Sequence, residues 1–353
     1  MQTQSNDTPD SADLVAAQKL RDSHRRIREE LRKIIVGQDD VIEQLLIALF
    51  AGGHCIIEGV PGLAKTLMIS SLARCLSLSF SRIQFTPDLM PSDITGTEVI
   101  AEDRATGSRV FRFLKGPVFA NIILADEINR TPPKTQAAML ESMQERQVTV
   151  GGVRHALDEP FFVLATQNPI EQEGTYPLPE AQQDRFMFKV FIGYPTYDEE
   201  CEIAQRTTTE TTPEVASLLS GAEIVELQRI VRRVPIAPPI VRHAVDLVRK
   251  SRPADPTAPE FIRKNVAWGA GPRAVQYLIL AAKARAVLRG HYHVSTEDLR
   301  ALAAPVLRHR VIPNFAAQAL GYTPDRLVAE LLEATPPHQG GSADETRSAK
   351  VFS

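Results

Sequence analysis

A glycine-containing loop that ends in a lysine and a threonine runs from Gly59 to Thr66. It joins an apolar run to the start of a predicted helix, so its backbone N–H groups could surround phosphate oxygens. Lys65 could then reach the β and γ phosphates of a nucleotide, and the Thr66 hydroxyl could ligate Mg²⁺. The candidate binding segment is Gly59, Val60, Pro61, Gly62, Leu63, Ala64, Lys65, Thr66 and Leu67.

Ala64 departs from the usual pattern of such loops, which have glycine immediately before the lysine. Its methyl group would lie beside the phosphates, and a positive φ is costly for alanine, so we expect Gly62 to supply the flexibility instead. The alternative interpretation is a simple turn between a strand and a helix. Such a turn needs glycine but has no need of Lys65 and Thr66, so phosphate binding is favoured.

Two carboxylates, Asp126 and Glu127, follow the apolar run 122–125. One carboxylate at the end of a strand can anchor Mg²⁺, and its neighbour can polarise the attacking water as a general base. We therefore assign Asp126 to the metal and Glu127 to the water. A strand that ends in surface acids is the alternative, and it becomes a poor one downstream of a phosphate-type loop.

A third polar position, Asn168, follows the predicted strand 161–165. Ligands of open parallel sheets bind at the carboxyl ends of the strands, so Asn168 could hold the attacking water or the γ phosphate. Asn168-Pro169 is also a common turn sequence, which is the alternative for this segment taken alone.

Short apolar runs alternate with helical segments in the first half of the chain. This alternation predicts an α/β fold, and the continuous apolar runs predict parallel strands that are buried on both faces. We expect Asp39 or Asp40 to be the N-cap of the second helix. The predicted strands are 54–58, 82–85, 122–125, 161–165 and 186–190, and the predicted helices are 16–35, 40–49, 65–76 and 135–145.

Two segments within 97–113 and 147–157 interrupt the sheet with strand–turn–strand patterns. After Gly193 only helical periodicity appears, over 222–232, 240–251, 272–289, 295–306 and 314–331. We therefore predict a disordered N-terminus (1–14), an α/β core with two hairpin inserts (15–193), an all-helical domain (194–335) and a disordered tail (336–353).

The composition is that of an ordinary soluble protein. A net charge of -3 gives no general attraction to nucleic acid or to anionic membranes. No apolar run reaches the roughly 20 residues that span a bilayer. The N-terminus has no signal-peptide pattern, and Cys55, Cys75 and Cys201 have no metal-type or disulfide-type spacing. We expect a cytoplasmic protein.

These motifs, in this order and spacing, resemble those of AAA+ ATPases, and the fuller set is similar to the MoxR family within them. The resemblance extends from about Leu31 to Val311. It implies a P-loop core with a five-stranded parallel sheet, a C-terminal all-helical lid, and hydrolysis of ATP that depends on Mg²⁺. The segments that carry it are 36–38, 59–66, 84–93, 126–130, 141–145, 180–186 and 271–274.

The resemblance also implies roles for three arginines. Arg185 matches the arginine finger that enters the neighbouring subunit's site, and Arg130 is a second candidate for a contact across the interface. Arg273 matches the sensor-2 arginine that reaches from the lid to the γ phosphate. Without the resemblance, Arg185 would be a surface residue paired with Asp184, and Arg273 a charge at a helix start, where the dipole disfavours it.

Other implied roles concern the adenine pocket and the partner. Val36, Gly37 and Gln38 match the segment that lines the adenine pocket. The hairpins match inserts that usually face the centre of a hexameric ring, and the segment 110–113 could grip a partner or be an ordinary amphipathic strand. The family's usual substrate is a partner protein, often with a von Willebrand A domain, on which the ring acts as a chaperone.

Two other functions stay open at this stage. The first is a nucleic-acid-remodelling motor, because related AAA+ branches include helicases with similar hairpins. The second hairpin has acids beside Arg154, and no dense basic patch is visible, so no nucleic acid is expected. The second is a nucleotide-binding scaffold without turnover, against which the intact Lys65, Asp126 and Glu127 argue.

Overall fold

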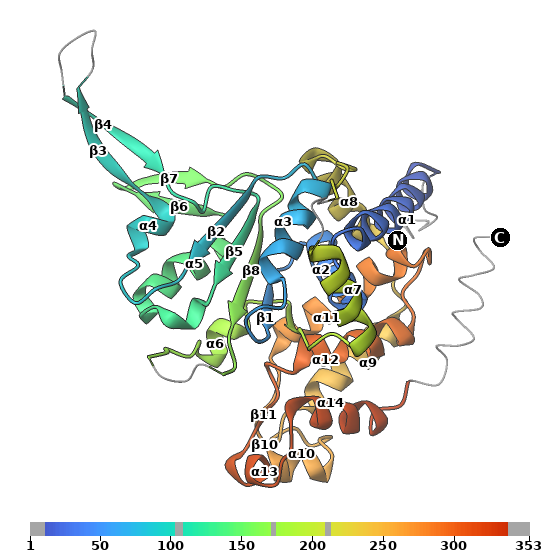
Figure 1. Ribbon diagram of the computed structural model, residues 1–353. Coiled ribbons are helices and arrows are strands. Elements are labelled where there is room, and N and C mark those ends of the chain that lie inside the picture. The colour runs from blue at the N-terminus through green and yellow to red at the C-terminus, as the bar shows by residue number, and fades with distance from the viewer. Residues whose placement is uncertain (1–10, 103–108, 171–173, 209–212, 338–353) are drawn as a thin grey trace, which may run out of the picture.

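A five-stranded parallel sheet in the order β2-β5-β8-β1-β9 forms the centre of the molecule (Figure 1). The computed structural model describes residues 11–102, 109–170, 174–208 and 213–337. The predicted sheet is therefore confirmed, with small shifts at the strand ends. Its strands are β1 (Cys55–Glu58), β2 (Phe80–Gln84), β5 (Ile122–Asp126), β8 (Phe162–Gln167) and β9 (Phe188–Phe191).

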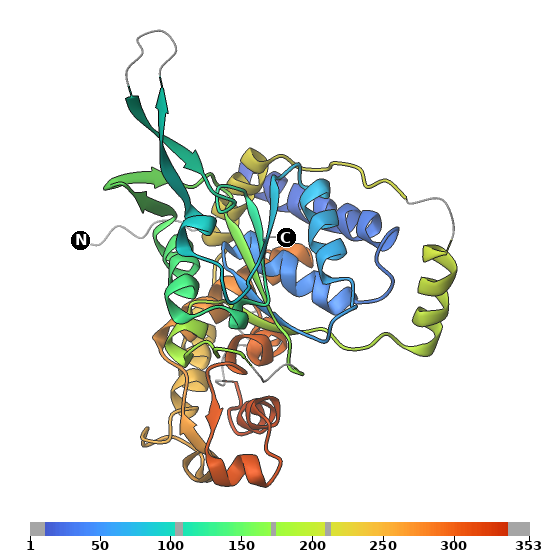
Figure 2. The same ribbon diagram turned by 60° about the vertical axis from the view of Figure 1, so that its left-hand side comes forward.

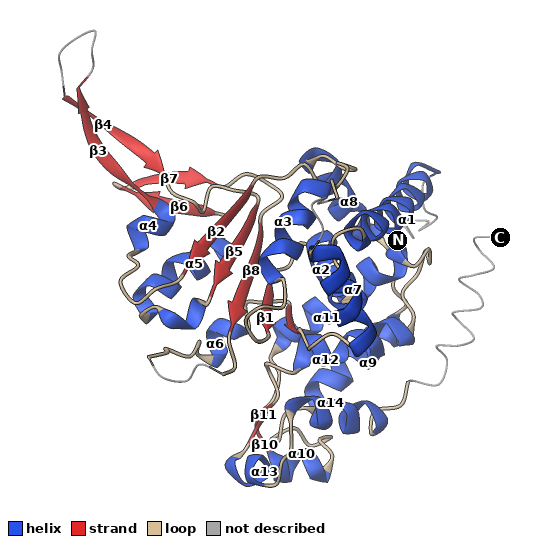
Figure 3. Cartoon of the chain, viewed as in Figure 1, coloured by secondary structure: helices blue, strands red, loops and turns tan. Residues whose placement is uncertain are grey.

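Helices cover both faces of this sheet (Figure 3). Successive strand residues point to opposite faces, so β5 places Leu124 in one hydrophobic cluster and Ile123 in the other. The larger cluster contains helices α1 (Ser11–Arg32), α2 (Asp39–Ala51) and α3 (Lys65–Cys75). The smaller cluster contains α4 (Pro91–Thr95), the short 3-10 helix η1 (Ile128–Arg130) and α5 (Pro133–Glu145).

Both predicted hairpins are present. The first, β3 (Gly96–Glu102) and β4 (Arg109–Lys115), projects away from the body of the molecule (Figure 2). Its expected turn, 103–108, lies outside the described residues. The second hairpin is β6 (Gln147–Val150) and β7 (Val153–Ala156). Phe113 of the first hairpin stacks on His155 of the second, with ring centroids 4.1 Å apart.

The C-terminal part is predominantly helical, as expected. The prediction of no strand after Gly193 is wrong in one place, because β10 (Val266–Trp268) and β11 (Ile312–Pro313) form a small antiparallel pair. These strands are too short to show a period in the sequence. The helices after the hairpins are α6 (Glu180–Gln183), α7 (Tyr197–Thr207), α8 (Gly221–Arg233), α9 (Pro238–Lys250), α10 (Glu260–Asn265), α11 (Pro272–Leu288), α12 (Thr296–Leu307), α13 (Phe315–Ala319) and α14 (Pro324–Glu333).

Two expectations near the N-terminus need correction. Helix α1 begins at Ser11, so residues 11–14 are not disordered as predicted, and the rest of that segment and residues 338–353 lie outside the described part. The N-cap of α2 is Gln38, in the left-handed region, rather than Asp39 or Asp40. The Asp39 carboxylate accepts hydrogen bonds from Arg28 and Arg32 of α1 instead.

The boundary between core and lid remains a prediction. Helix α11 packs against α1 and α2, and all three contribute to one hydrophobic cluster. Within the described ranges, none of the helices combines the length and the apolar character that crossing a membrane requires.

Candidate active site

A cavity of about 420 Å³ lies at the carboxyl ends of the sheet strands. Parallel register places Gln84 beside Asp126 and Glu58 beside Gln167, so the strands end at one edge of the sheet. The structure therefore brings together the predicted phosphate loop, both acids and Asn168. The lining residues are Pro61, Gly62, Leu63, Ala64, Lys65, Thr66, Leu67, Arg82, Asp126, Glu127, Thr166 and Asn168.

Lys65 folds back onto its own loop. Its Nζ donates hydrogen bonds to the backbone oxygens of Gly59 at 2.6 Å and Val60 at 3.3 Å. Burial lowers the pKa of this amine, while the carboxylates of Asp126 and Glu127 act in the opposite direction. Phosphate oxygens are charged and would be stronger acceptors than the two carbonyls. The Lys65 ammonium is thus positioned so that it could exchange these carbonyl oxygens for the phosphate oxygens of a bound triphosphate.

Ala64 adopts the left-handed conformation that its side chain disfavours, with φ 54° and ψ 24°. The expectation that Gly62 would supply the flexibility instead is wrong, because both residues have positive φ and that of Gly62 is 86°. The helix α3 starts immediately after Ala64, and the tight turn into it requires this backbone geometry. A left-handed L-residue costs about 1–2 kcal/mol.

Backbone strain is concentrated at the predicted nucleotide residues. Three of the residues predicted to contact nucleotide or water, Gln38, Ala64 and Glu127, are non-glycine residues with positive φ. The other such residues in the described part of the chain are Ser77 and Arg146. Strained conformations persist where the surroundings determine them, and they often mark functional sites.

Asp126 is buried and held on both of its oxygens. Oδ1 accepts a hydrogen bond from the Thr166 hydroxyl at 2.6 Å. Oδ2 accepts from Arg82 through Nε at 3.0 Å and Nη2 at 2.6 Å. An Mg²⁺ ion near Asp126 would therefore share this carboxylate with a guanidinium, and a contact through a metal-bound water would suit that arrangement.

The residues present fit a nucleotide-bound Mg²⁺. Thr66 and Asp126 line the same cavity, and Mg²⁺ commonly takes one or two protein ligands together with phosphate oxygens and waters. Among the residues that the structure describes, no group of three or more His, Cys, Asp and Glu side chains could hold a metal alone. The phosphates of a nucleotide would have to complete the coordination.

Hydrogen bonds from two side chains restrain the carboxylate of Glu127. Its Oε2 accepts hydrogen bonds from Gln84 Nε2 at 2.8 Å and from Arg130 Nη1 at 3.1 Å. Its backbone N–H donates to the Thr166 hydroxyl at 2.8 Å. Thr166 thus ties the backbone of Glu127 and the carboxylate of Asp126 to the end of β8.

Sequence reasoning missed the roles of Arg82, Gln84 and Thr166. Arg82 and Gln84 are two residues apart in β2, so both point to the same face of the strand. That alternation was visible in the sequence, but the pairing of β2 with β5 was not. Only this pairing places the two side chains beside Asp126 and Glu127.

Other predicted residues lie outside the cavity. Arg273 Nη1 donates to Asp184 at 2.8 Å, and Tyr277 of the same helix donates its hydroxyl to the backbone oxygen of Arg185 at 2.8 Å. Arg185 Nη1 donates to the Leu140 oxygen at 3.3 Å. The two predicted arginines are therefore close to each other, where α11 meets the end of α6. Their roles at a phosphate stay predictions.

The predicted adenine segment also lies outside the cavity. Gln38 Nε2 donates to the Gly193 oxygen at 3.1 Å, which ties the start of α2 to the segment after β9. A Cβ at Gly37 would meet Glu199 Oε1 at 2.1 Å, so α7 passes close to this backbone. Adenine contacts of Val36, Gly37 and Gln38 remain a prediction.

A phosphate loop after β1, two acids at the end of β5 on the far side of β8, and a C-terminal helical region together define a nucleotide-hydrolysing P-loop protein. Comparison with known proteins agrees. The family model for the ATPase family associated with various cellular activities (AAA) matches residues 54–188. The AAA lid domain model matches residues 258–331.

Individual relatives extend over nearly the whole chain. Chaperone MoxR1 of Mycobacterium tuberculosis is 42% identical, over 91% of this chain and 85% of its own. Protein MoxR of Methylorubrum extorquens is 30% identical, over 90% of this chain and 95% of its own. The crystal structure of a candidate ATPase from Cytophaga hutchinsonii is 40% identical, with a TM-score of 0.85 over 92% of this chain and 98% of that one.

The chain belongs to the MoxR family of AAA+ ATPases. It is accordingly an enzyme that binds nucleotide and hydrolyses ATP. The resemblance that the sequence motifs carried is thereby confirmed.

Replacing Ala64 with glycine tests whether the phosphate loop is strained. Relief of about 1–2 kcal/mol of left-handed strain should exceed the roughly 0.4–1 kcal/mol that glycine adds to the entropy of the unfolded chain. We expect Ala64→Gly to leave the free energy of unfolding unchanged or to raise it by up to about 1.6 kcal/mol. Denaturant titration followed by circular dichroism measures this quantity.

Ala204→Gly is the matched control, because Ala204 is exposed within helix α7. Glycine there should lower the free energy of unfolding by about 1 kcal/mol. Equal losses in the two variants would show that Ala64 is not strained.

Proposed function

We propose that this chain is a chaperone that uses ATP hydrolysis to remodel or mature a partner protein, and that it acts as a homo-oligomeric, hexameric ring. The observation that carries the proposal is the convergence of Lys65, Thr66, Asp126 and Glu127 on one cavity. Family membership supports the rest, since one relative is named as a chaperone.

Five side chains of the cavity have a part in the proposed hydrolysis. Lys65 would bind phosphate oxygens, and Thr66 and Asp126 would hold Mg²⁺, which neutralises charge on the phosphates when bound. Asn168 would orient the attacking water. Glu127 would accept a proton from that water as general base.

Glu127 is restrained in the present arrangement. Gln84 and Arg130 both donate hydrogen bonds to Oε2, so this oxygen is engaged by two donors before any proton transfer. We propose that hydrolysis requires at least one of these donors to release Oε2. Nucleotide binding or a neighbouring subunit could supply the change.

A second cation is needed to offset charge that develops on the transferred phosphoryl group. Arg82, which lines the cavity, is engaged by Asp126, and Arg130, which does not line it, pairs with Glu127 of its own chain. We therefore propose that Arg185 of a neighbouring subunit completes the site, and that Arg273 acts from the lid. Activity would then depend on assembly.

The first hairpin is the proposed contact with the partner protein. Phe111 is 74% exposed and Ile100 is 63% exposed, and the two are directly paired across β3 and β4. Stacking of Phe113 on His155 anchors the base of the same hairpin. Exposed apolar pairs on a projecting element can bind an apolar segment of another protein. We propose a partner with a von Willebrand A domain, which family membership supports.

Substitution of Glu127 with glutamine tests the assignment of the base. The amide keeps the size and hydrogen bonding of the side chain but cannot accept the proton from water. We expect phosphate release to fall by about 100-fold or more while ATP affinity changes little. Glu226→Gln, an exposed position on α8, should hydrolyse ATP at the wild-type rate. Equal rates for the Glu127 and Glu226 variants would contradict the assignment.

Dilution tests the role of the neighbouring subunit. If Arg185 acts across an interface, phosphate release per chain should rise steeply with protein concentration, and Arg185→Ala should remain at the low value throughout. We expect a loss of about 10³-fold in turnover at saturating protein. Mixing the Arg185→Ala and Glu127→Gln variants should restore part of the activity, since each can supply what the other lacks. A rate per chain that is independent of concentration would refute the assembly requirement.

Capture on the Glu127→Gln variant tests the nature of the partner. Slow hydrolysis should prolong the ATP-bound state, so a bound protein should be retained with ATP and released without it. We expect proteins with a von Willebrand A domain by mass spectrometry, and weaker capture when Phe111→Ala is added. Enrichment of nucleic acid in place of protein would favour the nucleic-acid motor.

A further inference from the structure

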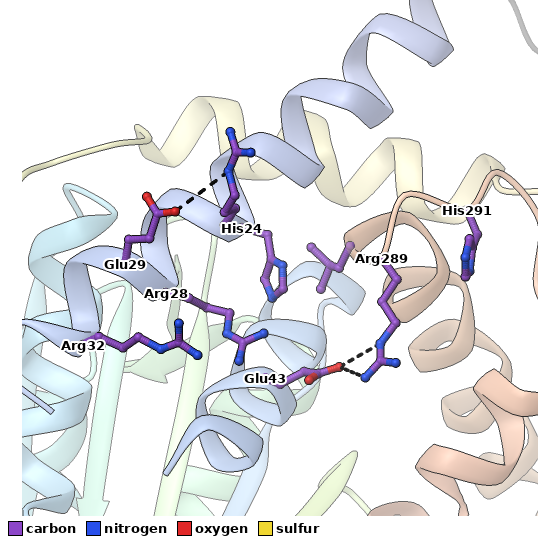
Figure 4. Close-up of a pocket in the computed structure, with 9 residues that line it drawn as sticks. His24, Arg28, Glu29, Arg32, Glu43, Arg289 and His291 are labelled. Atoms are coloured by element: carbon purple, nitrogen blue, oxygen red, sulfur yellow. Dashed lines mark hydrogen bonds and ion pairs between the residues drawn. The ribbon is translucent and has the colours of Figure 1, made fainter. Parts of the chain in front are cut away.

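A second cavity, of about 510 Å³, shares no lining residue with the cavity at the phosphate loop, and Figure 4 shows its walls. Its walls come from α1, from α2 and from the C-terminal end of α11 with the turn that follows. Helices α1 and α2 precede the part of the chain that matches the AAA family model. The lining residues are His24, Arg25, Arg28, Glu29, Arg32, Glu43, Leu288, Arg289 and His291.

Two buried nitrogens of this cavity have no acceptor among the described residues. His24 is 7% exposed, and its Nε2 has no hydrogen-bond partner there. Arg28 donates through Nη2 to Asp39 at 3.2 Å, while its Nε is buried without a partner in the described chain. Figure 4 shows the His24 ring pointing towards Arg28 and Glu43. Buried polar groups without partners are rare, and they often indicate a ligand or water.

Nearby carboxylates position the arginines of this cavity but accept hydrogen bonds from only some of their N–H groups. Arg289 donates through Nε and Nη2 to Glu43, and Arg32 donates through the same two nitrogens to Asp39. Arg25 lies within 4.0 Å of Glu29. A guanidinium carries five N–H donors in a rigid fork, so each arginine retains donors beyond these pairs. The cavity wall is therefore rich in donors, with four arginines against two carboxylates.

His24 is neutral at physiological pH. Its pKa is lowered to about 4, mainly by burial and then by the charge of Arg28, while Glu43 acts in the opposite direction and Arg289 lowers it slightly. A neutral imidazole can donate one hydrogen bond through Nε2 to an anionic oxygen. An anion bound at that nitrogen would stabilise the charged ring and raise this pKa.

We propose that this cavity binds a small phosphate-bearing anion through Arg28, Arg289 and His24. Guanidinium forks match phosphate oxygens in geometry, and the volume falls within the roughly 300–1,000 Å³ of small-molecule sites. Either a free polyphosphate or the phosphates of a second nucleotide have this chemistry.

The location gives such an anion a structural effect. Helix α2 follows directly after the predicted adenine segment, and α11 starts with Pro272 and Arg273. An anion held by both α1 and α11 joins the lid helix to the N-terminal helices and restricts their relative motion. Any effect of the bound anion on ATP hydrolysis rests on the proposed function. Binding of the anion to this cavity does not depend on that function.

Calorimetric titration with inorganic tripolyphosphate tests the site. We expect two binding events in the wild-type protein, one at the phosphate loop and one in this cavity. In Arg28→Gln/Arg289→Gln the second event should weaken by about tenfold or more, because charge-assisted donors are lost. Arg326→Gln removes one positive charge elsewhere, at an exposed partner of Glu330 on α14, so it is the charge-matched control for the single variant Arg289→Gln and should retain both events.

The single variant Arg289→Gln is included in case the double variant does not fold. Because the Arg289 side chain is 44% exposed, this substitution should leave the fold intact. Thermal unfolding checks that each variant is folded. A parallel titration with ADP separates the sources: a second ADP event that the double variant loses indicates a nucleotide, and its absence indicates free polyphosphate.

The His24 ring gives a readout that locates the anion. In nuclear magnetic resonance spectra, saturating tripolyphosphate should raise the pKa of His24 above its value of about 4 in wild type but not in the double variant. A single tripolyphosphate event that the double variant retains, together with an unchanged His24 titration, would overturn the proposal. Loss of the phosphate-loop event alone would count against the proposed ATPase site and leave this one standing.

Discussion

The hydroxyl of Thr166 connects the two acids on which hydrolysis depends. It donates to the Asp126 carboxylate and accepts from the backbone N–H of Glu127. This bridge exists because β5 and β8 are parallel neighbours in register, with Ala125 opposite Ala165. The next strand, β1, leads directly into the phosphate loop. A shift of register by one residue would turn Thr166 to the other face and separate the acids from Lys65.

Two residues with strained backbone conformations lie at the same edge of the sheet. Ala64 and Glu127 both have left-handed backbones directly after a loop or a strand, where the chain must turn sharply into a helix. The strands that lead to these residues are firmly packed, since Ile57 of β1 and Leu124 of β5 are completely buried. A stable sheet therefore supports an unfavourable local conformation that points functional groups into a cavity.

Features that depend on the local sequence pattern could be predicted from the sequence. The five strands, both hairpins and the phosphate loop all follow from apolar runs, turns and the Lys65-Thr66 pair. The sequence was insufficient where contacts join distant segments. Arg82 reaches Asp126 only through strand pairing, and the strands β10 and β11 are too short to show a period. Asp39 or Asp40 was expected to cap α2, but the cap is Gln38, and two arginines from α1 engage Asp39, which no local pattern reveals.

The most direct test of ATP binding at the phosphate loop is to determine which atoms Lys65 contacts when ATP is bound. In the present arrangement its Nζ is bonded to the oxygens of Gly59 and Val60. A crystal structure of the Glu127→Gln variant with ATP and Mg²⁺ should show this ammonium on phosphate oxygens, with Asp126 and Thr66 facing the metal. A nucleotide bound elsewhere, or Lys65 still bonded to its own loop with ATP present, would contradict the account.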